Sequence, residues 1–236
     1  MKKPIILLSL MLSAGLHAQI SFEKLESKGK DDPMDISYLV EPEMVRGTPL
    51  GFNEWRKGRV VVTSGDTSDY FLINYHTLGD VVYFKNEQTE DLYMTDETSI
   101  QALLLTNPDT GNVDRFERIL WQNFEEYPKD PRICQILVWK PDFELIRYFD
   151  KELEKPEETS NDKFDRRPVL EAYNPKVRYF WRSSDAGLFE EVDFNKNWLR
   201  EVLSKDQQDK MKDYQKANKI KWNDDDEVVA MLNEIL

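Results

Sequence analysis

The chain has 236 residues, a formal net charge of −13 and 40% hydrophobic residues. A surface with this acidic excess repels phosphate backbones and anionic lipid headgroups, so nucleic acid is not an expected partner. The length suits one large domain or two small ones, with a core that needs no disulfide. Cys134 is the only cysteine, so an intramolecular disulfide cannot form.

The first 18 residues have the pattern of a secretory signal peptide. Lys2 and Lys3 precede an apolar run over residues 5–16, and Ala18 offers a small residue for cleavage before Gln19. The run is shorter than the roughly 20 apolar residues that cross a bilayer, and no later run approaches that length. We therefore expect an exported mature protein, periplasmic or secreted, without a transmembrane segment. Because Gln19 is not a cysteine, we expect no lipid anchor there.

Residues 19–46 carry many charges and little apolar periodicity, which predicts a loosely ordered segment with one short strand at 36–40. From residue 47 onward, short strand patterns recur between turn residues, as in an antiparallel meander. These patterns lie at residues 59–63, 70–75, 81–85, 91–94 and 100–105. In the second of them, Phe71, Ile73 and Tyr75 share one face of the expected strand.

The middle of the chain predicts a clear hairpin. Residues 133–139 and 143–149 are rich in β-branched and aromatic side chains and flank a turn around Pro141. Cys134 lies in the first arm, where a thiol is expected to be buried as a small hydrophobe rather than to act as a nucleophile. The preceding stretch, 113–121, is ambiguous between strand and helix.

A charged stretch at residues 151–167 lacks apolar periodicity and contains Pro156, so we expect a solvated excursion and a candidate internal boundary. Beyond it, three more strands are expected at residues 169–173, 177–181 and 188–192. Turns between these strands are expected at Asn174-Pro175 and at residues 184–187.

The apolar spacing becomes helical near the C-terminus, at residues 199–203 and again at 228–236. Ser204 begins a capping-box pattern that predicts a polar helix to about Ala217. Asn223, followed by three aspartates, predicts the start of a last helix with acidic residues at its positive end. We expect these helices to lie on the sheet.

Together these patterns predict an α+β fold, mainly an antiparallel β meander arranged as a sandwich or a partly open barrel, with short C-terminal helices packed on the sheet. The fold is expected to begin near Gly47. The predicted divisions are a signal peptide at 1–18, a loosely ordered segment at 19–46, an antiparallel β domain at 47–193 with a charged insert near 151–167, and C-terminal helices at 194–236.

Several stretches carry a family resemblance: residues 47–58 leading into 70–75, then 179–181, 185–192, 195–199 and 219–228. In these stretches the chain resembles uncharacterised exported β-rich proteins of Bacteroidota, and the resemblance covers residues 47–236. It implies an envelope or secreted location and a β-rich body closed by short helices. It implies no activity and carries over no catalytic residue. Residues 122–132 and 151–167 look like departures from that pattern.

His76 is the only histidine that remains once the predicted signal peptide is removed. One histidine excludes a multi-histidine metal site. It leaves His76 as the sole candidate for a Ser-His-Asp triad, and the chain contains no G-x-S-x-G motif. His76 is expected to be a solvated loop residue. The sequence thus predicts no catalytic residue, no cofactor and no metal ligand.

The acidic run at residues 223–227 is a candidate calcium site, because carboxylates are the oxygen ligands that Ca²⁺ prefers. Its spacing does not match an EF-hand loop, since the sixth position from Asn223 is Val228 rather than glycine. Helix capping accounts for the run, and calcium-stabilised binding stays open as a minor alternative.

Six tryptophans are spread along the chain. Trp139 and Trp181 lie on apolar strand patterns, and Trp198 and Trp222 flank predicted helices, so burial is expected for these four. Trp55 is the one least explained by packing, because charged residues surround it. A sugar-stacking platform on a β face is the alternative that these aromatics leave open.

The expected function is that of a non-enzymatic binding or interaction module of the cell envelope, with an envelope or extracellular protein or glycan as partner. The export signal, the meander and the lack of a nucleophile–base or metal constellation support this hypothesis. The alternative is a carboxylate-dependent hydrolase acting on envelope or extracellular carbohydrate. A chain with 45 acidic residues leaves a catalytic carboxylate pair open.

Overall fold

The computed structural model describes residues 23–24, 45–77, 81–96, 99–126, 132–154, 171–183 and 187–236. Their strands form one sheet, and nearly every pair of neighbours in it is antiparallel. The strands are β1 (Glu23–Lys24), β2 (Val45–Arg46), β3 (Arg56–Val62), β4 (Phe71–Tyr75), β5 (Val81–Lys85), β6 (Leu92–Asp96), β7 (Ile100–Thr106), β8 (Val113–Ile119), β9 (Arg132–Lys140), β10 (Phe143–Glu154), β11 (Glu171–Arg182) and β12 (Glu190–Val192). The helices are the 3-10 turn η2 (Trp121–Asn123), α2 (Lys196–Val202), α3 (Lys205–Asn218) and α4 (Asp225–Ile235).

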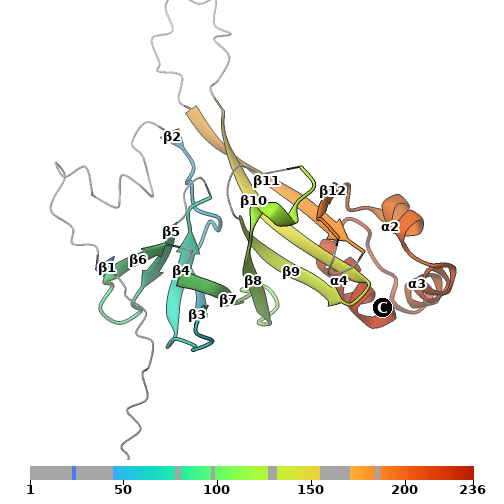
Figure 1. Cartoon of the computed structure of the whole chain (residues 1–236), viewed down its shortest axis with the longest axis horizontal. Helices are drawn as coiled ribbons and strands as arrows, with labels where there is room; N and C mark the ends of the chain where they lie inside the picture. The colour runs from blue at the N-terminus through green and yellow to red at the C-terminus, as the bar shows by residue number, and fades with distance from the viewer. Residues whose placement is uncertain are drawn as a thin grey trace, which may run out of the picture.

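The sheet is an open meander with the strand order β1-β6-β5-β4-β3-β7-β8-β9-β10-β11-β12, and β2 pairs in parallel with the start of β11. Two halves can be distinguished along it, and Figure 1 shows them side by side with the three helices gathered at one end. We call β3 to β7 the N-terminal half and β8 to β12, with the helices, the C-terminal half. The arrangement confirms the predicted α+β fold with a mainly antiparallel sheet.

Most of the expected strands form within one or two residues of the predicted bounds. The ambiguous stretch at 113–121 is the strand β8 followed by η2. The hairpin of β9 and β10 is confirmed, with Phe143 opposite Lys140 at its closed end. β1 and β2 lie inside the segment expected to be loosely ordered. The predicted strand at 36–40 falls outside the described residues, as do residues 184–186 of the turn predicted at 184–187.

β10 and β11 are both 12 residues long, and their length corrects two predictions. The excursion expected from residue 151 is wrong for Lys151 to Glu154, which continue β10, and residues 155–170 lie outside the described part. The turn expected at Asn174-Pro175 is also wrong, since Pro175 pairs with Lys151 inside the ladder. Proline fits there because the described pairings on the other edge of β11 involve only residues 171–172 and 179–181.

The helices begin at side-chain caps that can be recognised in the sequence. Ser204 and Gln207 form the predicted capping box at the start of α3. The last helix corrects the prediction by one residue, because its cap is Asp224 rather than Asn223. The Asp224 carboxylate accepts a hydrogen bond from the backbone N–H of Glu227, three residues further along the chain, which is the usual N-cap hydrogen bond.

Three apolar clusters make up the core of the described residues. One centres on Phe52, Val60 and Phe84 of the N-terminal half and extends to Phe116 on β8. A second lies between β9–β11 and the helices, and the third covers the opposite face of the same strands. Because this half is covered on both faces, residues 143–146 are all buried instead of alternating with solvent. The helices therefore lie on the sheet as predicted.

Cys134 is fully buried in the third cluster, which confirms its expected place in the core. Trp181, Trp198 and Trp222 are half-buried and pack against the helical cluster. The prediction for Trp139 is wrong, because 49% of it is exposed. A β-bulge places Leu137 between paired residues of β9, so Leu137 and Val138 both face the helices and Trp139 faces outward under the Arg182 guanidinium.

Candidate functional site

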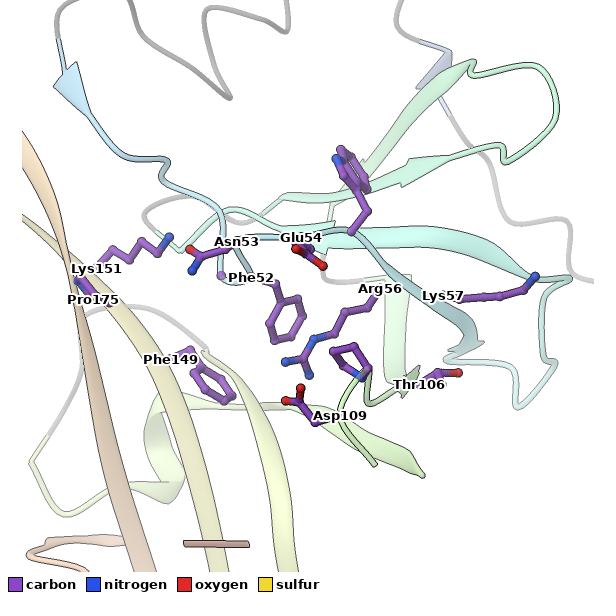
Figure 2. Close-up of a pocket in the computed structure, with 13 residues that line it drawn as sticks. Phe52, Asn53, Glu54, Arg56, Lys57, Thr106, Asp109, Phe149, Lys151 and Pro175 are labelled. Atoms are coloured by element: carbon purple, nitrogen blue, oxygen red, sulfur yellow. The ribbon is translucent and has the colours of Figure 1, made fainter. Parts of the chain in front are cut away.

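A cavity of about 610 Å³ lies where the two halves of the sheet meet, and we call it the junction cavity. Its lining consists of residues 51–57, Thr106, Pro108, Asp109, Phe149, Lys151 and Pro175. Residues 51–57 come from the loop before β3 and from its first two residues, and the last three residues come from β10 and β11. Figure 2 shows side chains from these distant segments directed into a common space.

The loop that forms one wall is held in place by buried hydrogen bonds. The Asn74 side chain accepts the backbone N–H of Phe52 at 3.1 Å and donates to its carbonyl at 2.9 Å. The Gly51 N–H donates to the Tyr75 carbonyl at 2.8 Å. A Cβ on Gly51 would lie 2.3 Å from the Tyr75 ring, so only glycine permits this approach. The wall is therefore preorganised by its contacts with β4.

Aromatic rings form the floor of the cavity. Phe52 packs edge-to-face against Tyr75 and Phe116, with ring centroids 5.4 Å apart in each pair. It also contacts Phe149 at 5.8 Å, which joins the loop to β10. Edge-to-face packing of this kind fixes ring orientation beyond what apolar burial alone requires. The floor is thus rigid and apolar.

Arg56 crosses this floor from the start of β3. Its guanidinium carbon lies 3.8 Å from the centroid of Phe52, and among the described residues it forms one ion pair, with Asp114 at 3.6 Å. Only 19% of the side chain is exposed, and burial lowers the pKa of Arg56, opposed by the charge of Asp114. Within the described residues the guanidinium makes no hydrogen bond. Figure 2 shows it directed toward Asp109 and the ring of Phe52.

Lys151 lies toward the opposite end of the cavity from Thr106 and Lys57 (Figure 2). The residue is only 6% exposed, and burial lowers the pKa of its ammonium group. Its Nζ donates one hydrogen bond, to the Thr48 carbonyl at 2.9 Å. In the part of the chain that the structure describes, no carboxylate pairs with it. An ammonium has three donors, so two are available.

Acidic groups are present as well. Glu54 and Asp109 line the cavity and are exposed. Burial raises the pKa of Asp114, which lies behind Arg56, while Arg56 and a hydrogen bond from Asn107 oppose that shift.

His76 lies outside the cavity, in a bridge with Leu50, and it is half-buried rather than solvated as predicted. Burial lowers the pKa of His76.

The acidic run of the last helix is used for contacts within the protein. Asp225 accepts a hydrogen bond from the Tyr179 hydroxyl, and Asp226 pairs with Arg147 at 3.4 Å. Glu227 accepts the backbone N–H of Lys221 at 2.8 Å. Among the described residues, no group of three or more His, Cys, Asp or Glu side chains is arranged to hold a metal ion. These contacts bind α4 to the sheet, and we call Arg147, Gln135, Tyr179, Asp225 and Asp226 the α4 anchor.

Sequence reasoning drew attention to Trp55 and to the stretch 47–58, which supplies one wall of the cavity. It did not single out Arg56, Phe149 or Lys151. The available signal was the strand period: Arg147, Phe149 and Lys151 alternate along β10 and share one face. That Phe149 and Lys151 meet the loop before β3 depends on pairing between strands far apart in the sequence.

No protein-family model, no curated protein and no solved structure matches this chain. None of the helices in the described ranges has the length and apolar character that a membrane crossing requires.

Proposed function

We propose that the protein is an exported, non-enzymatic binding module of the cell envelope and that it binds its partner at the junction cavity. The observation that carries this proposal is the cavity itself: about 610 Å³, with an aromatic floor and a wall fixed by the Asn74 side chain. Ligand sites are usually such preformed concavities, largely apolar with a few placed polar groups.

The N-terminal signal-peptide pattern supports a periplasmic or secreted location, as does the resemblance to exported Bacteroidota proteins. A partner in that location is an envelope or extracellular glycan or protein. The cavity has the size for one small molecule or for the end of a longer chain, rather than for a folded domain.

The test is a thermal-shift panel of envelope-derived glycans and peptides on the mature protein, with one variant that fills the cavity. Asn53 is exposed and lines the cavity, so Asn53→Trp should block it without disturbing the core. Asn218→Trp, at the exposed end of α3, is the matched control. A ligand that raises the Tm of wild type and Asn218→Trp but not of Asn53→Trp would support the proposal. Equal shifts in all three would contradict it.

A carboxylate-dependent hydrolase is the second candidate, because Glu54 and Asp109 line the same cavity and the pKa of nearby Asp114 is raised by burial. A raised pKa is what a general acid requires. A glycoside panel tests this function. Turnover by wild type that is lost in Asp114→Asn, Glu54→Gln or Asp109→Asn would favour the hydrolase over the binding module.

A further inference from the structure

The half-buried Arg56 and the buried Lys151 line the junction cavity, and neither fills its hydrogen-bonding capacity with the described protein groups. We infer that the cavity binds an organic monocarboxylate, in which an apolar ring or chain covers the aromatic floor, Arg56 holds the carboxylate, and Lys151 adds positive charge from the other end of the cavity. This inference rests on the proposed function, because it names the chemistry that the cavity would recognise.

Arg56 supplies the stronger part of the case. A guanidinium offers five N–H donors in a planar fork that matches a carboxylate. Here the guanidinium carbon lies 3.8 Å from the centroid of the Phe52 ring, so a cation–π contact helps to hold the group in place before a ligand arrives. Asp114 approaches to 3.6 Å, which is an ion-pair distance but longer than a charge-assisted hydrogen bond. The donors that face the cavity can therefore be satisfied by an incoming anion.

Lys151 supplies a second positive charge at the other end. A lysine that is 94% buried usually has a carboxylate partner, yet the one described partner of its Nζ is the neutral carbonyl of Thr48. A bound carboxylate would offset the desolvation of this ammonium. The lysine is held on β10 two residues beyond Phe149, so the cation and the aromatic floor belong to one strand face.

The remaining lining decides which anion fits. Phe52 and Phe149 present apolar surface, as do Pro108 and Pro175 on the other sides. Glu54 and Asp109 are exposed and negatively charged, and the Asp109 charge acts on Arg56. They repel a second negative charge on a ligand, so a phosphate or a dicarboxylate is disfavoured relative to a single carboxylate. The cavity therefore suits one carboxylate on an apolar body.

The test compares benzoate with benzamide, which has the same ring without the charge. Titrations of the isotope-labelled mature protein would be followed through the backbone amide NMR signals of residues 51–57. Benzoate is expected to shift these signals with a Kd on the order of 1 mM, as suits so small a ligand. Benzamide and inorganic phosphate should each bind at least about tenfold more weakly.

Variants assign the effect to the two cations. Arg56→Gln should weaken benzoate binding about tenfold or more, with Arg56→Lys intermediate because it keeps the charge but not the fork, and Lys151→Met should weaken it by a smaller factor because it removes charge at the other end of the cavity. Arg115→Gln is the matched control, since Arg115 is exposed and alternates with Asp114 and Phe116 onto the opposite face of β8. Thermal melts show whether each variant is folded.

The outcomes separate this inference from the function on which it rests. If benzamide binds as tightly as benzoate, or if folded Arg56→Gln and Lys151→Met bind benzoate like wild type, recognition of the anion is wrong while the cavity can still bind neutral ligands. If neither these probes nor the glycan and peptide panel affects residues 51–57, the proposed function itself is contradicted.

Discussion

Arg147 and Arg56 lie close together on one side of the sheet. Arg147 is used for contacts within the fold, whereas Arg56 keeps donors that a ligand can use, and comparing them shows what distinguishes the two roles. Arg147 donates two hydrogen bonds to the Gln135 side-chain oxygen, at 3.0 and 2.8 Å, and reaches Asp226 on α4 at 3.4 Å. Arg56 has one carboxylate at 3.6 Å and, in the described chain, no hydrogen bond. Both guanidinium groups lie over phenylalanine rings that touch each other.

The difference follows from what surrounds each group. The α4 anchor joins α4 to the sheet, so its donors and acceptors form hydrogen bonds with one another in the folded protein. Arg56 and Lys151 line a cavity instead, and each keeps donors beyond its contact with Asp114 or Thr48 that a ligand can use. Buried polar groups are normally satisfied within the fold, so a pair left for something else marks a functional region.

The largest effect is expected from Gly51→Ala, which moves the cavity wall without changing any charge. The added Cβ would lie 2.3 Å from the Tyr75 ring, and relieving that clash should lower the free energy of unfolding by about 2 to 3 kcal/mol. Urea unfolding measures it. Gly65→Ala offers a comparison without a clash, since nothing lies within 4 Å of a Cβ there, although the left-handed φ of Gly65 adds strain of its own. If Gly51→Ala is as stable as wild type, the wall is not held as described.

Arg147→Met tests the structural side of the comparison. Gln135 is 4% exposed, so losing Arg147 leaves its side-chain oxygen without its donors and should cost about 2 kcal/mol of unfolding free energy. Chemical denaturation gives the value. The exposed Arg115→Met should change stability by no more than about 0.5 kcal/mol. Equal effects of the two substitutions would mean that the α4 anchor contributes nothing.

Tyr179→Phe removes the hydroxyl that donates to Asp225 and should cost about 1 kcal/mol at neutral pH. Burial, together with Asp225, raises the pKa of Tyr179 to about 12. The folded protein therefore keeps this proton between the unfolded value near 10 and about 12, so the contribution of Tyr179 to stability falls as pH rises through that window. Unfolding measured from pH 9 to 12 should show a shallower loss for Tyr179→Phe than for wild type.

The control for that experiment is Tyr70→Phe, because Tyr70 is 61% exposed. It should follow the wild-type curve across the alkaline range. A parallel loss of stability in Tyr179→Phe and wild type would show that this hydroxyl is not a buried donor.

Lys151→Met removes a cation that we propose is available to a ligand. Of these four substitutions it should change the stability of the ligand-free protein least. Removing a buried ammonium relieves its desolvation, while losing the bond to Thr48 opposes that gain, so stability should stay within about 0.5 kcal/mol of wild type or rise. Thermal unfolding without ligand measures it. Lys212→Met, on the exposed surface of α3, is the matched control. A loss as large as that of Arg147→Met would make Lys151 a structural residue.

The local parts of the fold could be predicted because their signals are local. The alternation of apolar and polar residues predicted most strands, and the capping box at Ser204 predicted the start of α3. The continuity of β11 through Pro175 could not be predicted, because it depends on the ladder with Lys151 and on which edge of the strand is paired. Trp139 was misplaced for a similar reason, since a single bulge in β9 reverses its face.

The site was harder to predict than the fold. Residues 51–57 and Phe149 are far apart in the sequence, and three strands, β7, β8 and β9, lie between β3 and β10 in the sheet, so the sequence does not show that they line one cavity. Charged neighbours around Trp55 were the one usable hint, and they proved to be a cavity wall.

A crystal structure of the mature protein soaked with benzoate tests the central claim most directly. The account predicts density for the carboxylate in the junction cavity, with an oxygen about 2.8 Å from an Arg56 guanidinium nitrogen and the ring against Phe149. Benzoate bound elsewhere, or an Arg56 guanidinium fully hydrogen-bonded to Asp114 with the cavity filled by protein, would contradict it.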